Sequence, residues 1–164
     1  MMADLNNPSL LAAIERQNAL YARCLDNDAL EQWPEFFSER CEYQITTAAN
    51  VRNGYPIAMV YADTRLMLVD RVRSLRQANI YEKQSYRHLL GRTLILGGTG
   101  FDDVETETPF MVARIMENGQ TILYATGHYL DRVAVSEDMQ SVVLHERKVI
   151  CDSPFVDTLL AIPL

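Results

Sequence analysis

Three histidines are the residues of this sequence whose charge changes most readily near neutral pH. They are His88, His128 and His145. Neutral imidazole binds iron and zinc, and the same ring carries protons in acid–base catalysis. His88 follows Arg87 at the start of the apolar, β-branched run QSYRHLLGRTLIL, residues 84–96. The residue type therefore allows a metal ligand, a proton carrier or a structural contact, and the spacing of neighbouring residues must decide.

The spacing of cysteines and histidines argues against a metal site. A Rieske cluster needs C-x-H and C-x-x-H pairs, and no cysteine precedes a histidine at either spacing. A facial triad of two histidines and one carboxylate stays open on residue counts alone. The three histidines nevertheless fall on different predicted strands without paired spacing, so we expect no metal in this chain. The isolated Cys24, Cys41 and Cys151 predict buried free thiols.

Proton-transfer chemistry is the main catalytic alternative. Alternation along TILYATGHYLDRV places Tyr124 and His128 on one face of a strand and Asp131 on the other. A free-standing isomerase or dehydratase would use His128 or His88 as base, supported by Tyr124 or Asp131. Tyrosine and histidine also fill junctions between a sheet and a helix or another subunit, because each has an apolar body and a polar tip. We favour this structural interpretation.

The Arg87-His88 pair also fits a protein interface. Arginine is favoured at protein contacts because its planar guanidinium binds carboxylates with two hydrogen bonds. The dipeptides Asp70-Arg71 and Glu146-Arg147 are similar candidates, which we expect to be exposed.

Composition places the chain among folded globular domains. Its 164 residues are 48% hydrophobic and 23% charged, which predicts one domain over residues 1–164. The net charge of -7 argues against nucleic acid and anionic membranes as partners. There is neither an apolar stretch of roughly 18 residues nor a secretory signal, so we expect a cytoplasmic protein that does not bind membranes.

Helix signals dominate the first half of the chain. Asn7 and Pro8 predict a helix start, and Asp28 with Glu31 has the spacing of a capping box before a helix shortened by Pro34. We expect Trp33 and the range 36–37 to anchor this helical layer. The next segments predict a strand at 41–49, a turn at 53–54 and a short strand at 57–61. They are followed by a predicted helix over 63–77 capped by Asp63.

The second half predicts a β-meander. Long β-rich segments are separated by GGTGFDD, ENG and SEDM, which favour antiparallel strands. GGTG at 97–100 lacks the Lys-Ser/Thr of a phosphate loop and predicts a hairpin or bulge. Helices followed by a meander indicate an α+β fold, with N-terminal helices packed on a curved antiparallel sheet. This is the cone of the nuclear-transport-factor-2-like (NTF2-like, cystatin-like) folds, an architecture that does not name a function.

Four segments resemble a known family, the small (β) subunit of aromatic ring-hydroxylating Rieske dioxygenases. They are residues 28–46, 67–91, 108–116 and 146–164. The resemblance includes D-R-V at 70–72, R-H at 87–88, and a last strand with an arginine that ends in D-S at 152–153. It is strongest for the subgroup acting on aromatic acids, above all terephthalate, with salicylate and aminobenzoate enzymes as relatives.

The resemblance implies a non-catalytic subunit. In that family a large α subunit holds the Rieske [2Fe-2S] cluster and a mononuclear Fe(II), and an α3β3 hexamer converts the aromatic acid to a cis-dihydrodiol with electrons from NAD(P)H through a reductase. The resemblance therefore implies no catalytic, cofactor-binding or metal-binding residue in this chain. The candidate structural or interface residues are Arg87, His88, Trp33, Arg71, Arg147 and Asp152.

Overall fold

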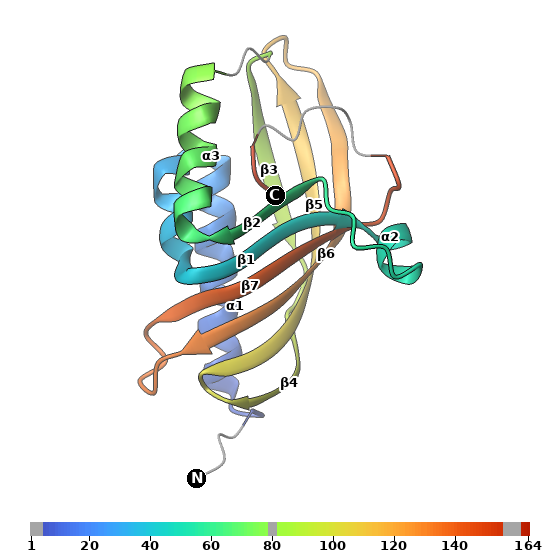
Figure 1. Cartoon of the computed structure of the whole chain (residues 1–164). Coiled ribbons are helices and arrows are strands. Elements are labelled where there is room, and N and C mark those ends of the chain that lie inside the picture. Colours follow the sequence, from blue (N-terminus) through green and yellow to red (C-terminus); the bar gives the residue numbers. More distant parts are fainter. Residues whose placement is uncertain (1–4, 79–81, 156–161) are drawn as a thin grey trace.

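A computed structural model of the chain describes residues 5–78, 82–155 and 162–164. A helical layer packs against one face of a curved seven-stranded sheet, which confirms the predicted α+β arrangement (Figure 1). The elements are α1 Pro8–Asp26, the 3-10 helix η1 Leu30–Phe36, β1 Phe37–Thr47, α2 Ala48–Arg52, β2 Val60–Thr64, α3 Arg65–Ala78, β3 Gln84–Leu90, β4 Leu94–Gly100, β5 Asp103–Met116, β6 Thr121–Val135 and β7 Val142–Cys151.

The start of the first helix follows its local sequence. The Asn7 side chain accepts a hydrogen bond from the backbone N–H of Ser9 at 2.9 Å, and Pro8 occupies the first turn. The helix buries Ile14, Tyr21 and Leu25 at helical spacing.

The predicted capping box at Asp28 and Glu31 is wrong. Asp28 has a left-handed φ of 56°, and η1 starts after Ala29 without a side-chain cap. Both carboxylates instead bind Arg76 of α3, whose Nη1 lies 2.9 Å from Asp28 and whose Nε lies 2.7 Å from Glu31. A contact between distant segments thus takes the acceptors that a local cap needs.

The boundaries around β1 and β2 also shift. β1 begins before the predicted range and ends at Thr47, where α2 starts. The predicted turn contains Gly54 at a φ of 66°. β2 extends through Asp63, so Asp63 does not cap α3. The Thr64 hydroxyl caps this helix instead, because it accepts a hydrogen bond from the backbone N–H of Met67 at 3.3 Å.

The sheet has the strand order β2-β1-β7-β6-β5-β3, and β4 also pairs with β5. The prediction of an antiparallel sheet holds for every pair except β1 and β7, which run parallel. These two strands are far apart in sequence, so no hairpin dictates their direction. The expected bulge lies in β4, where Gly98 has a φ of 141° and a Cβ would come within 2.2 Å of the Asp103 carbonyl oxygen.

Aromatic side chains fill the space between the helices and the sheet. Trp33 is fully buried, as predicted. Its ring centroid lies 5.0 Å from that of Tyr43 and 5.7 Å from that of Phe37. Phe36 is only partly buried, at the edge of Tyr21. The segment 162–164 lies in the same core, and Leu164 is completely buried.

Candidate functional site

A buried ion pair lies at the centre of the inner, helix-covered face of the sheet. Arg147 of β7 donates from Nε and Nη2 to the two carboxylate oxygens of Asp131 on β6, at 2.9 and 2.7 Å. Its Nη2 also donates to Asn18 Oδ1 of α1 at 2.6 Å. The guanidinium lies between the rings of Tyr21 and Tyr129, 4.1 Å from each centroid.

This network corrects the expectation that Arg147 is exposed. The side chains of Arg147 and Asp131 are 0% and 1% exposed. Burial alone would lower the pKa of Arg147, but the adjacent Asp131 carboxylate raises it above its ordinary value, so the guanidinium stays charged. The sequence interpretation did not identify Asn18 as a partner. Arg147 is therefore a core residue that joins α1 to two strands.

His88 forms a second buried contact, between β3 and the end of α1. Its Nδ1 lies 2.6 Å from Asp26 Oδ1, and its backbone N–H donates to Asp26 Oδ2 at 3.0 Å. The side chains of His88 and Asp26 are 0% and 4% exposed. Among the described residues the Nε2 of His88 has no hydrogen-bond partner. The geometry is that of a structural joint, in which Asp26 holds both the backbone and the ring of His88.

Arg87 points to the other side of the sheet. Its side chain is 67% exposed, and its Nη1 lies 3.7 Å from Asp26. The strand separates the two members of the Arg87-His88 pair, because successive side chains of β3 face opposite ways. Only Arg87 is accessible to another protein.

The remaining candidate residues lie in different surroundings. Asp152 is exposed and accepts the Thr126 hydroxyl at 2.8 Å. Arg71 is half-buried on α3, and its charge lowers the pKa of the buried Tyr43 against the larger raising effect of burial. Asp70 forms an ion pair with Arg73 at 3.5 Å. The structure therefore does not gather the predicted residues into one site.

Two residues of the acid–base alternative, Tyr124 and His128, lie on opposite faces of the sheet, whereas the ring of Tyr86 lies between those of His88 and Tyr124. A bulge in β6 opposite residues 112–113 brings Tyr124 against the buried Tyr86, at 5.3 Å between centroids. The buried Tyr129 stacks on Phe110 on the inner face, which puts its neighbour His128 on the outer face. The predicted common face of Tyr124 and His128 is therefore wrong, because strict alternation fails at a bulge.

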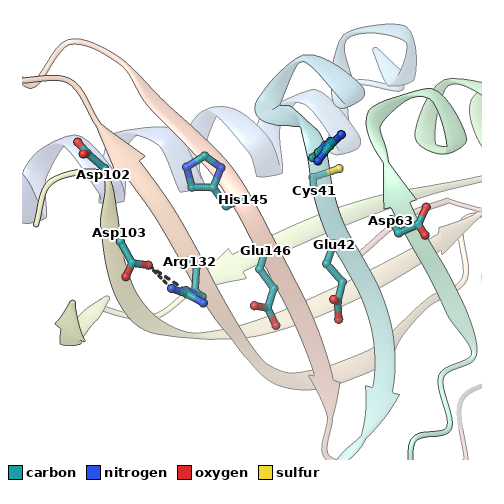
Figure 2. A pocket seen from close by; sticks show the side chains of 9 residues that line it. Cys41, Glu42, Asp63, Asp102, Asp103, Arg132, His145 and Glu146 are labelled. Atoms are coloured by element: carbon teal, nitrogen blue, oxygen red, sulfur yellow. Dashed lines mark hydrogen bonds and ion pairs between the residues drawn. The ribbon is translucent and has the colours of Figure 1, made fainter. Parts of the chain in front are cut away.

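A shallow pocket of about 530 Å³ lies on the outer face of the sheet (Figure 2). Glu42, Glu146 and Arg132 lie in a row across three strands, and Arg132 binds Asp103 at 2.6 Å. Burial, and then the charge of Glu42, raise the pKa of Glu146. Two carboxylates thus face each other on adjacent strands, an arrangement that destabilises the sheet locally.

Metal-binding groups are dispersed. Within the described ranges, no three His, Cys, Asp or Glu side chains form a group that could hold a metal ion. All three cysteines are buried and free, as predicted. Burial raises the pKa of Cys24 and of Cys151 to about 11, so both thiols are protonated at neutral pH and are poor metal ligands.

The helices in the described part of the chain are all too short or too polar to cross a membrane.

Comparisons with known proteins agree with the fold. Residues 21–158 match the family model described as ring hydroxylating beta subunit. The chain is 45% identical over 147 residues to subunit beta 1 of the terminal oxygenase component of terephthalate 1,2-dioxygenase from Comamonas sp, a match covering 90% of this chain and 94% of that one. It is 39% identical to the anthranilate 1,2-dioxygenase small subunit of Burkholderia cepacia, over 88% of each chain.

A crystal structure gives the same result. The β subunit assigned to an aromatic-ring-hydroxylating dioxygenase of Novosphingobium aromaticivorans DSM 12444 superimposes with a TM-score of 0.84 at 42% identity, over 94% of this chain and 96% of that one. A chain of the naphthalene 1,2-dioxygenase structure with indole bound shares the fold, with a TM-score of 0.73 at 17% identity over 99% of this chain and 90% of that one. The cone is therefore NTF2-like, as predicted, and the chain belongs to the family of ring-hydroxylating dioxygenase β subunits.

Proposed function

We propose that this chain is the structural small subunit of an oxygenase that dihydroxylates an aromatic acid such as terephthalate in the cytoplasm. Its partner is a large α subunit, in an α3β3 hexamer. That partner holds the Rieske [2Fe-2S] cluster and the mononuclear Fe(II), and it receives electrons from NAD(P)H through a reductase. The observation that carries the proposal is the 45% identity to terephthalate dioxygenase β subunits across nearly the whole chain.

The filled interior of the cone supports a structural role. Tyr21, Trp33, Tyr43, Tyr129 and Leu164 are each at most 1% exposed, and they occupy the space that a cone-fold enzyme would need for substrate. The charged groups inside, Arg147 and Asp131, are bound to each other. They hold the fold together and leave no accessible acid or base at this position.

Part of the outer sheet face supports a docking role. Leu89, Met111 and Leu123 are 66%, 45% and 60% exposed on adjacent strands next to Arg87. Apolar side chains grouped in this way mark protein interaction sites. We assign this group of four residues to the contact with the large subunit.

Co-expression with the large chain encoded by the neighbouring gene tests the function. The proposal requires that chain to contain C-x-H and C-x-x-H motifs, and the two chains to co-elute as a red-brown complex in size-exclusion chromatography. It fails if this chain, purified alone, turns over an aromatic compound or retains stoichiometric metal.

A charge placed in the apolar group tests the contact itself. Leu123→Glu should reduce the yield of the complex at least tenfold while the isolated subunit keeps its Tm. Leu20→Glu is the matched control, because Leu20 is 47% exposed on α1, away from the sheet. Equal yields from both variants would place the large subunit elsewhere.

His88 separates a structural role from a role in iron binding. His88→Ala leaves the buried Asp26 carboxylate without its imidazole, so it should lower stability or assembly, while the iron content per large subunit stays normal. His145→Ala is the control, since His145 is exposed and its Nδ1 lies 3.0 Å from the Ser38 hydroxyl, away from Asp26. Assembled hexamers of His88→Ala that fold but lack iron would overturn this assignment.

A further inference from the structure

A pocket of about 300 Å³ lies between α1 and the connection from β3 to β4. β5 pairs with β3 as far as Phe110 and with β4 from Glu107, which leaves the residues between them, 108–109, outside both ladders. Glu15 and Asn18 of α1 line the pocket together, because residues three positions apart lie on the same face of a helix. The pocket therefore occupies the break between two strands.

Three polar side chains that line this pocket are almost completely buried. They are Asn18, Thr93 and Thr108, which are 4%, 3% and 1% exposed. Asn18 Nδ2 donates to both hydroxyls, at 3.4 Å to Thr93 and at 3.2 Å to Thr108. The Oδ1 of Asn18 accepts a hydrogen bond from Arg147. Hydrogen bonds thus hold all three side chains and connect the wall of the pocket to the ion pair in the core.

The two threonine hydroxyls carry one proton more than this group of three side chains accepts. Thr93 Oγ1 and Thr108 Oγ1 lie 2.9 Å apart, so one hydroxyl donates its proton to the other. The proton of the second hydroxyl has no acceptor in the described part of the chain. A buried donor without an acceptor costs free energy, so an acceptor that enters the pocket gains this hydrogen bond.

Opposite charges line the same pocket without pairing with each other. Glu15 is half-buried, and its Oε1 accepts the Thr93 backbone N–H at 3.2 Å, whereas its Oε2 has no donor among the described residues. Arg92 is exposed and forms no ion pair within the described ranges. Leu90 adds an apolar surface. The pocket therefore offers a carboxylate, a guanidinium and a hydroxyl donor, with no net charge.

We propose that this pocket binds a small zwitterion, namely an α-amino acid with a short apolar side chain. The carboxylate of the ligand accepts the remaining threonine proton and pairs with Arg92, since hydrogen bonds to ionised groups are the stronger ones. The ammonium group of the ligand donates to Glu15 Oε2. The short side chain packs against Leu90, and a volume at the lower end of the range for small-molecule sites excludes a large one.

Singly charged ligands fit this set of groups less well. A cation alone leaves the remaining threonine proton without an acceptor, and an anion alone brings a second negative charge to Glu15. A ligand that carries both charges satisfies every polar group of the pocket. The site does not depend on the proposed oxygenase function, because none of its residues belongs to the group assigned to the large subunit.

An NMR titration of the full chain with L-alanine is the first test. The Thr93 backbone amide and the Asn18 side-chain amide should shift saturably. The affinity for L-alanine should be at least tenfold higher than that for acetate or for ethylamine, each of which carries one of the two charges. Equal affinities for the three probes would overturn the proposal. The absence of a saturable shift up to 100 mM would also overturn it, because solvent alone would then fill the pocket.

Single substitutions at the two charged groups are the second test. Glu15→Gln and Arg92→Gln should each weaken L-alanine binding at least fivefold, because each removes one of the two ion pairs with the ligand. Glu137→Gln and Arg52→Gln are the matched controls, since both residues are exposed and lie outside the pocket. Equal weakening by the controls would contradict the assignment, and if a pocket variant fails to fold, the comparison of the three probes on the native chain decides.

Discussion

The two faces of the sheet use the same ion-pair chemistry with opposite consequences. On the inner face Arg147 forms an ion pair with Asp131, and both side chains are excluded from water. On the outer face Arg132 forms an ion pair with Asp103, and the Arg132 side chain is 50% exposed. Both pairs have an N···O distance of 2.6 to 2.7 Å. The distance alone therefore does not set how much an ion pair contributes to stability. Solvent screens the outer pair, whereas the loss of either inner partner leaves a buried charge without a counter-charge.

Removing Arg147 should give the largest effect. Arg147→Ala leaves the Asp131 carboxylate uncompensated and opens a cavity between Tyr21 and Tyr129, so unfolding by urea should require about 3–5 kcal/mol less free energy. Arg132→Ala is the matched control on the outer face and should cost far less. Similar losses in the two variants would break the comparison between the faces.

Trp33 tests how much of the inner face depends on aromatic packing. Trp33→Ala should lower the free energy of unfolding by about 3–5 kcal/mol, at or just below the Arg147 effect, because it removes a fully buried ring that also donates to Tyr21. Phe155→Ala removes an aromatic side chain that is 87% exposed and should be nearly neutral. A negligible cost at Trp33 would mean that its ring is accessible to solvent.

Gly127 tests the approach of β6 to β7 beside the inner face. A Cβ at this position would lie 2.0 Å from the Ile150 carbonyl oxygen, so Gly127→Ala must push the strands apart. We expect a loss of about 1–3 kcal/mol in thermal or urea unfolding, the range for overpacked sites. Gly97→Ala, where the nearest atom is a flexible Glu105 oxygen at 3.9 Å, should be tolerated. A tolerated Gly127→Ala would indicate a wider separation between the strands.

Glu146 on the outer face should show the smallest effect, as a dependence on pH. Its folded pKa is raised by burial and by Glu42, so the folded state holds its proton more tightly than the unfolded state. Stability contributed by Glu146 is therefore lost as the pH rises from the ordinary glutamate pKa through the raised one.

Removing that ionisation gives the measurement. Glu146→Gln should raise the free energy of unfolding at pH 7 by less than about 1 kcal/mol, since solvent screening limits the effect of a half-exposed group. In this variant the free energy of unfolding should also decrease less as the pH rises above the ordinary glutamate pKa. Glu137→Gln removes an equal charge at an exposed position of the turn before β7 and serves as control. The same change in both variants would point to net charge rather than to the Glu42 contact.

Most of the fold was predictable from local patterns. Asn7 and Pro8 start α1 through backbone effects confined to one turn, and the glycines at 97–100 mark the bulge that only their backbone permits. The family was recognisable because its motifs extend along nearly the whole chain. A signal for the inner ion pair was also present, since Arg147 and Asp131 alternate in phase with the buried Val149 and Tyr129. An arginine and an aspartate in the inward phase of neighbouring strands predict a buried pair.

Tertiary structure decided which distant residues contact one another. The sequence by itself determined most of the elements, the alternation of each strand away from its bulges and the separation of histidines and cysteines along the chain, because these depend on near neighbours. Only the folded chain assigned Asp28 and Glu31 to Arg76, His88 to Asp26, and Tyr21 and Tyr43 to Leu164. Each of these contacts joins residues more than 40 positions apart, and no local preference specifies which of several distant donors or acceptors will arrive.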